Sequence, residues 1–157
     1  MAWMIYVVGP CRVNNELLAS FLEAKVGKKC VTKGVINDVF ESDGQDTNIP
    51  KLVLLDCFAK DPEELFHEVE SCRRNTYNPG LVAVFNLIRG LRIEKELVKR
   101  GIRGIFYAHD HLEHLNRGVR ALLEGEMWIS REVMSKFIPE TEEPKRLSAD
   151  EETSVLS

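Results

Sequence analysis

Short apolar runs rich in branched residues recur along this chain, and polar stretches with Gly or Pro separate them. Runs of this length are typical of β-strands that are buried in a parallel sheet. The stretch from 41 to 50 is polar and is expected to be a loop. The pattern predicts five strands, at residues 4–8, 30–35, 52–55, 81–85 and 102–107.

Between these runs, apolar residues recur at helical spacing and follow residues that commonly begin helices. Asn14 or Asn15 can cap a first helix that Gly27 ends. Asp61 can cap another, with Pro62 in its first turn. Further helices are predicted at residues 91–99, 112–123 and 130–138.

Strands that alternate with helices imply βαβ units, and therefore an α/β domain built on a parallel sheet. This domain is expected to span residues 1–138. From Pro139 onward the composition changes to Glu, Thr, Pro, Lys and Ser, which predicts a linker at 139–146. A capping-box pattern then indicates that 147–157 begins another helix.

Composition restricts the class of protein. The formal net charge of −4 argues against nucleic-acid binding by this chain alone, because phosphate binding requires a basic face. We find no apolar stretch long enough to cross a membrane and no signal peptide. The four cysteines form no CxxC pair, so buried reduced thiols in a cytoplasmic protein are expected.

Two groups of residues are candidates for chemistry. Asp56 follows a buried apolar run, where open α/β sheets place their reactive groups. His109, His111 and His114 could form a metal site, although a solvated helix start is the preferred interpretation. The chain contains no Gly-rich phosphate loop and no Ser-His-Asp pattern, so we do not expect an enzyme.

The segment 101–107, the acidic and His-rich turn after it and the segment 125–131 resemble the end of a receiver domain in LuxR-type (NarL/FixJ-type) response regulators. The resemblance covers residues 4 to about 138. It implies a three-layer, doubly wound, five-stranded parallel sheet of the CheY-like or flavodoxin-like kind, with an appended sixth helix. It also implies a regulatory domain, with 147–157 as the possible start of a truncated helix-turn-helix domain whose DNA-binding part lies beyond Ser157.

A working receiver accepts a phosphoryl group on the Asp that follows strand three, here Asp56. That family also requires an acidic pair that holds Mg²⁺, a Ser or Thr after strand four and a Lys after strand five. Here these positions are Gly9 and Pro10, Asn86 and Ala108. We therefore expect neither Mg²⁺ binding nor a histidine kinase partner, and Asp56 is interpreted as a phosphoacceptor-equivalent residue that is not used.

The departures are similar to those of the receiver-like regulators of biofilm matrix genes, some of which bind cyclic di-GMP at a motif of Trp, an apolar residue, Thr or Ser, and Arg. Here the motif consists of Trp128, Ile129, Ser130 and Arg131. The resemblance implies a possible site for this nucleotide second messenger at Trp128, Ser130 and Arg131. Packing by Trp128 and helix capping by Ser130 form the alternative, which is the preferred interpretation.

These observations predict the signal-input and dimerisation domain of a LuxR-type transcription regulator that acts without phosphorylation and can respond to cyclic di-GMP. A homodimer is expected, because the polar faces of helices four and five are common dimer surfaces in this fold, with plain solvation of those faces as the alternative. The alternative is a phosphoacceptor receiver of a two-component phosphorelay that uses Asp56.

Overall fold

The computed structural model describes residues 3–41, 49–75, 80–90 and 92–137. Five parallel strands form one sheet with the order β2-β1-β3-β4-β5. The strands are β1 (Met4–Val8), β2 (Lys29–Lys33), β3 (Lys51–Asp56), β4 (Gly80–Leu87) and β5 (Gly104–Tyr107). The helices are α1 (Arg12–Val26), α2 (Asn37–Glu41), α3 (Pro62–Asn75), α4 (Glu94–Lys99), α5 (Leu112–Leu123) and α6 (Arg131–Met134).

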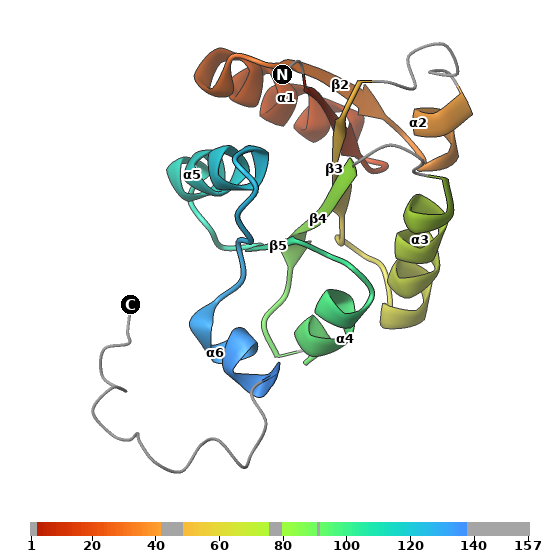
Figure 1. Ribbon diagram of the computed structural model, residues 1–157. Helices are drawn as coiled ribbons and strands as arrows, with labels where there is room; N and C mark the ends of the chain where they lie inside the picture. Colours follow the sequence, from red (N-terminus) through yellow and green to blue (C-terminus); the bar gives the residue numbers. More distant parts are fainter. Residues whose placement is uncertain (1–2, 42–48, 76–79, 91, 138–157) are drawn as a thin grey trace.

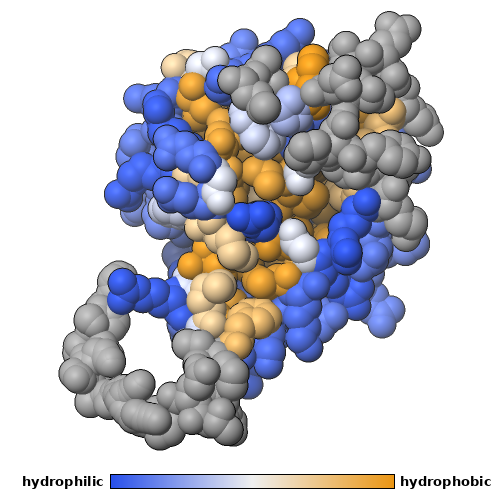
Figure 2. Space-filling model, viewed as in Figure 1, coloured by the Kyte–Doolittle hydropathy of each residue, from blue (hydrophilic) through white to orange (hydrophobic). Residues whose placement is uncertain are grey.

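Helices cover both faces of the sheet, which gives the three layers expected from the sequence (Figure 1). Successive strand residues point to opposite faces, so Ile5 and Val7 pack under α1 and α5. Tyr6 and Val8 pack on the other face, under α2, α3 and α4. Figure 2 shows apolar residues exposed between the hydrophilic surfaces of α5 and α3. None of the described helices is long and apolar enough to span a bilayer.

The structure corrects the predicted start of α1. The helix begins at Arg12 with Cys11 at its N-cap, and Cys11 makes no side-chain capping bond. Neither Asn14 nor Asn15 is the cap. Asn15 lies inside the helix, is buried, and donates a hydrogen bond from Nδ2 to the carbonyl oxygen of Gly9 at 3.0 Å. A contact with the neighbouring loop therefore determines the position of this side chain.

Other predicted elements differ at their ends. The helix α4 begins at Glu94, a turn later than predicted, and α2 was not predicted at all. Cys57 and Cys72 are buried, whereas Cys11 and Cys30 are only half-buried because one precedes α1 and the other lies on the edge strand β2. The predicted linker and helix-turn-helix start, at 139–146 and 147–157, lie outside the described residues.

The chain after α5 returns to the sheet. Trp128 forms a parallel bridge with Gly104, in which Trp128 N donates to the Arg103 carbonyl and Ile105 N donates to the Trp128 carbonyl. The appended sixth helix follows as α6, and one 3₁₀ turn, Ser135–Phe137, extends it. This segment therefore packs beside the outermost strand of the sheet.

Candidate functional site

Asp56 is the last residue of β3 and lies at the carboxyl edge of the sheet, where β1 and β3 are neighbours. In this strand order the connections change direction between β1 and β3, which is where such folds bind ligands. The residue is nevertheless only 2% exposed. The sequence predicted its place in the sheet correctly but did not predict its burial.

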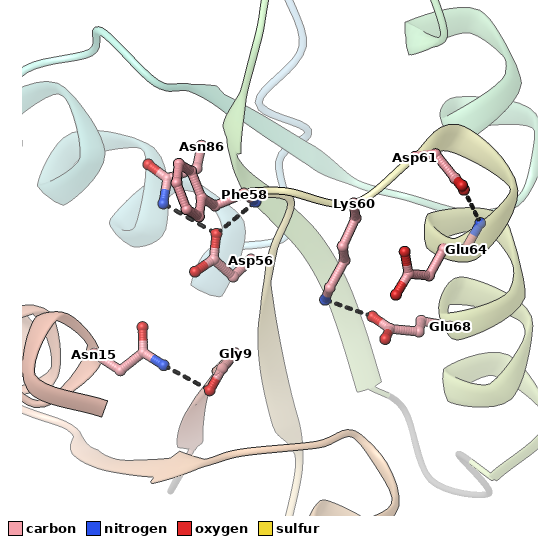
Figure 3. A network of polar contacts seen from close by, with 9 residues as sticks. All are labelled: Gly9, Asn15, Asp56, Phe58, Lys60, Asp61, Glu64, Glu68 and Asn86. Carbon is pink, nitrogen blue, oxygen red and sulfur yellow. Dashed lines mark hydrogen bonds and ion pairs between the residues drawn. The ribbon is translucent and has the colours of Figure 1, made fainter. Parts of the chain in front are cut away.

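Neutral groups hold the Asp56 carboxylate. Its Oδ1 accepts hydrogen bonds from the backbone N–H of Phe58 at 2.9 Å and from Asn86 Nδ2 at 3.0 Å (Figure 3). Asn86 has a φ of 65°, a left-handed conformation that Asn tolerates better than most residues. The residue that replaces the Ser or Thr of a working receiver therefore binds the unmodified carboxylate directly.

Gly9 occupies the space beside Asp56 where the acidic pair of a receiver would be expected. A Cβ atom at Gly9 would lie 2.6 Å from Asp56 Cβ and 2.9 Å from Asp56 Oδ2. The backbone at Gly9 is also fixed, because its carbonyl accepts the bond from Asn15. No side chain at this position fits the observed backbone.

The residues present do not fit a magnesium ion. Mg²⁺ requires oxygen ligands in near-octahedral geometry, and neither Gly9 nor Pro10 has a side-chain oxygen. In the part of the chain that the structure describes, no group of three or more His, Cys, Asp or Glu side chains could hold a metal ion.

The cationic side chains that follow β3 and β4 bind other groups. Lys60 follows β3, but its Nζ pairs with Glu68 on α3 at 2.7 Å (Figure 3). Arg89 follows β4, and its guanidinium carbon lies 4.0 Å from the centre of the Tyr107 ring. Ala108, at the position of the missing Lys, directly follows β5 and has no charge to offer.

Tyr107 is a buried polar residue that the sequence analysis did not identify. Its hydroxyl donates to Glu94 on α4 at 3.0 Å. Burial, and then the charge and hydrogen bond of Glu94, raise the pKa of Tyr107 well above its ordinary value. The phenol therefore stays protonated and links β5 to α4.

The motif at 128–131 lies beside β5. Trp128 packs with Phe106, at 6.4 Å between ring centres, and His114 meets the Trp128 ring edge-on at 5.1 Å. Ser130 caps α6, because its Oγ accepts from the Val133 N–H at 3.2 Å. Arg131 begins that helix and is exposed. Packing and capping contacts are thus present, and a ligand role for these residues stays a prediction.

The three histidines do not converge on one point. The Nε2 atom of His109 accepts from Arg89 Nε at 3.1 Å. His114 contacts Trp128, and His111 is exposed at the N-cap of α5. Each imidazole ring therefore has a different environment. These contacts fit the interpretation of this segment as a polar helix start.

Comparisons place this geometry among known folds. No family model and no curated protein matches the chain. Solved structures do match, with a TM-score of 0.67 and 18% identity to the regulatory domain of the master biofilm regulator CsgD, over 85% of this chain and 96% of that one. A response regulator from Thermotoga maritima matches with a TM-score of 0.66 and 19% identity, over 79% and 99% of the two chains.

A LuxR family DNA-binding response regulator from Silicibacter pomeroyi gives a TM-score of 0.64 at 18% identity, over 84% of this chain and 99% of that one. Identities this low establish the fold and leave the function to be argued from the site. The chain therefore has the CheY-like receiver fold found in LuxR-type response regulators.

Proposed function

We propose that this chain is the regulatory domain of a LuxR-type DNA-binding transcription regulator and that it works without phosphorylation of Asp56. The fold it shares with regulatory domains of that class supports the first part. The observation that carries the second part is the backbone of Gly9, which lies directly against Asp56.

Phosphoryl transfer is catalysed mainly by positioning the reactants and by stabilising the charge on the transferred group. Asp56 is 2% exposed, and one of its oxygens already accepts two neutral N–H groups. No acidic side chain follows β1 to hold a metal ion, and Ala108 offers no counter-charge. A phosphoryl group on Asp56 would therefore add negative charge without compensation.

Incubation with acetyl phosphate and Mg²⁺, followed by intact-mass measurement, tests this proposal. We expect no phospho-adduct on the wild-type chain under conditions that label a working receiver domain. Asp56→Asn is the matched control, because it keeps an acceptor for Phe58 and Asn86 but removes the phosphoacceptor. An adduct on the wild type that is absent from Asp56→Asn would establish the alternative, a phosphoacceptor receiver.

The proposed DNA contact belongs to a helix-turn-helix outside this chain, and the regulator is proposed to act as a homodimer. A gel-shift measurement at moderate salt should show no tight, sequence-specific binding by this chain, whose formal charge is −4. Sedimentation across a concentration series measures how much of the chain is dimeric at each concentration. Specific DNA binding by the chain alone would contradict this division of roles.

Binding of cyclic di-GMP at Trp128, Ser130 and Arg131 is the proposed ligand response. It is supported by the exposure of Arg131 beside the half-buried Trp128, since a guanidinium can stack on guanine and bind phosphate. Isothermal titration should give a saturable signal that Arg131→Ala abolishes. Arg117→Ala is the control. It removes an exposed arginine of α5, outside the motif, and should bind like the wild type.

A further inference from the structure

A cavity of about 330 Å³ opens between α1 and α5 at the carboxyl edge of the sheet. The two helices are joined at their other ends, where Arg120 Nη2 donates to the carbonyl of Lys25. Toward their amino ends they line the cavity from opposite sides, with Leu18 on α1 and Leu115 on α5. Its volume lies in the range of about 300–1,000 Å³ that small-molecule sites occupy.

The inner part of the cavity is aromatic. Phe85 and Phe106 come from adjacent strands β4 and β5 and pack in the core on this face of the sheet, where both line the cavity. Both residues are buried below 10% exposure, so the surrounding core holds their rings in place. Aromatic rings prefer to pack against other rings in stacked or edge-to-face arrangements. This surface therefore favours a flat ring system over a branched aliphatic chain.

Polar groups lie at the strand-end side of the same cavity. Asn86, Asp110 and His111 line it, and Asp110 is held in place because its Oδ2 accepts the backbone N–H of Tyr107 at 2.7 Å. A carboxylate in the lining repels anions and accepts hydrogen bonds. The complementary ligand is neutral or cationic and carries a hydrogen-bond donor at one end.

The entrance to the cavity is bordered by large apolar side chains that face solvent. Leu17 on α1 is 67% exposed and Leu112 on α5 is 55% exposed, and both line the cavity. An exposed apolar surface that continues into a cavity with polar residues at one side is typical of a binding site.

Asn86 connects this cavity to Asp56. It lines the cavity, donates to Asp56 Oδ1, and holds a left-handed backbone at φ 65°. A molecule in the cavity would therefore touch the residue that also binds the carboxylate at the phosphoacceptor position.

We propose that the cavity between α1 and α5 binds a small planar aromatic molecule, neutral or cationic, with its ring on Phe85 and Phe106 and its polar end toward Asn86 and Asp110. This site is separate from Trp128–Arg131. The aromatic ligand would be the input signal of the domain, in place of a phosphoryl group, which goes beyond the proposed function.

Fluorescence titration with N-phenyl-1-naphthylamine, a neutral aromatic probe with one N–H donor, tests the site. The wild type should bind it saturably with one site per chain. Ala108 is exposed and lines the cavity, so Ala108→Leu should occupy part of the space and weaken binding by about tenfold. Ala24→Leu makes the same change on the exposed surface of α1 outside the cavity lining, and should bind like the wild type.

An NMR titration of ¹⁵N-labelled wild type keeps the test independent of how the variant folds. The largest shifts should occur at the backbone amides of Leu18, Phe85 and Tyr107. Non-saturable binding, equal affinity of the two variants, or shifts confined to other elements would overturn the proposal. So would a dimer that excludes the probe, since a second copy would then cover the cavity. A phospho-adduct on Asp56 would refute only the proposed phosphorylation independence.

Discussion

At Gly9 the backbone after β1 passes so close to Asp56 that an acidic side chain could not be introduced there by substitution alone. An acidic residue here would need the loop to move, because even its Cβ would overlap Asp56 Cβ at 2.6 Å. Moving the loop would in turn break the bond from Asn15 Nδ2 to the Gly9 carbonyl. The proposed independence from phosphorylation is therefore supported by the backbone at Gly9 as well as by the side chains.

Gly9→Ala should destabilise the protein by about 1–3 kcal/mol, the usual cost of overpacking a close-packed site. Urea unfolding followed by circular dichroism measures the change. Gly34→Ala is the matched control, because no atom lies within 4 Å of a Cβ built there. Equal stability of the two variants would show that the loop at Gly9 adjusts freely.

The residues of this site were partly predictable. Alignment to the receiver pattern placed Gly9, Asn86 and Ala108 correctly at strand ends, because strand ends follow from the apolar pattern. The inward position of Asn15 was not predictable in the same way. Asn is a preferred helix cap, and only the folded loop provides the carbonyl that attracts its side chain into the interior.

The helix α5 lies close against the sheet at Gly118. A Cβ atom at this position would overlap the Phe106 ring and would lie 2.8 Å from Trp128 Nε1. The absence of a side chain lets α5 lie directly on both rings. Because the same rings connect β5 to the segment that carries α6, this helix determines where that segment packs.

Gly118→Ala should lower the free energy of unfolding by about 1–3 kcal/mol, even though alanine favours a helix. Displacement of Trp128 should also shift the intrinsic tryptophan fluorescence. Arg117→Ala, one residue earlier and exposed, should leave both measurements near the wild-type values. A stabilised Gly118→Ala variant would contradict the close approach.

How far a helix could be predicted depended on its length and periodicity. The bounds of α5 were predicted at Leu112–Leu123, since twelve residues with a clear apolar face give a strong signal. The helix α2 has only five residues, which are too few to show a helical period. Among them Val39 is buried and Phe40 is partly buried. Its position against the sheet, not its sequence, makes it helical.

The core of the molecule on the α3 side of the sheet contains two cysteine thiols that burial keeps neutral. Cys57 and Cys72 are buried there, and desolvation raises the pKa of each thiol to about 12. Thiols in an unfolded chain ionise near pH 8.5. Folding therefore disfavours the thiolate. The free energy of unfolding that the buried neutral thiols contribute is fully present below about pH 8.5, and it is lost as the pH rises toward 12.

The free energy of unfolding should consequently fall between pH 8 and pH 10 in urea titrations. Cys72→Ala should show a smaller fall over that interval, because one buried thiol no longer ionises on unfolding. Ser20→Ala removes an exposed hydroxyl on α1 that does not ionise in this interval, and should keep the wild-type pH dependence. Identical pH slopes for all three proteins would contradict the burial of the Cys72 thiol.

The bridge between Trp128 and Gly104 has a consequence for association between molecules. An outermost strand with unpaired backbone groups invites edge-to-edge aggregation. Beside β5, the N–H of Trp128 donates to the Arg103 carbonyl, and the Trp128 carbonyl accepts from the Ile105 N–H, so both groups are occupied. The opposite outermost strand, β2, begins and ends with Lys29 and Lys33, and lysines on an edge strand discourage another chain from pairing with it. The sheet is thereby protected at both sides from growing into a larger one.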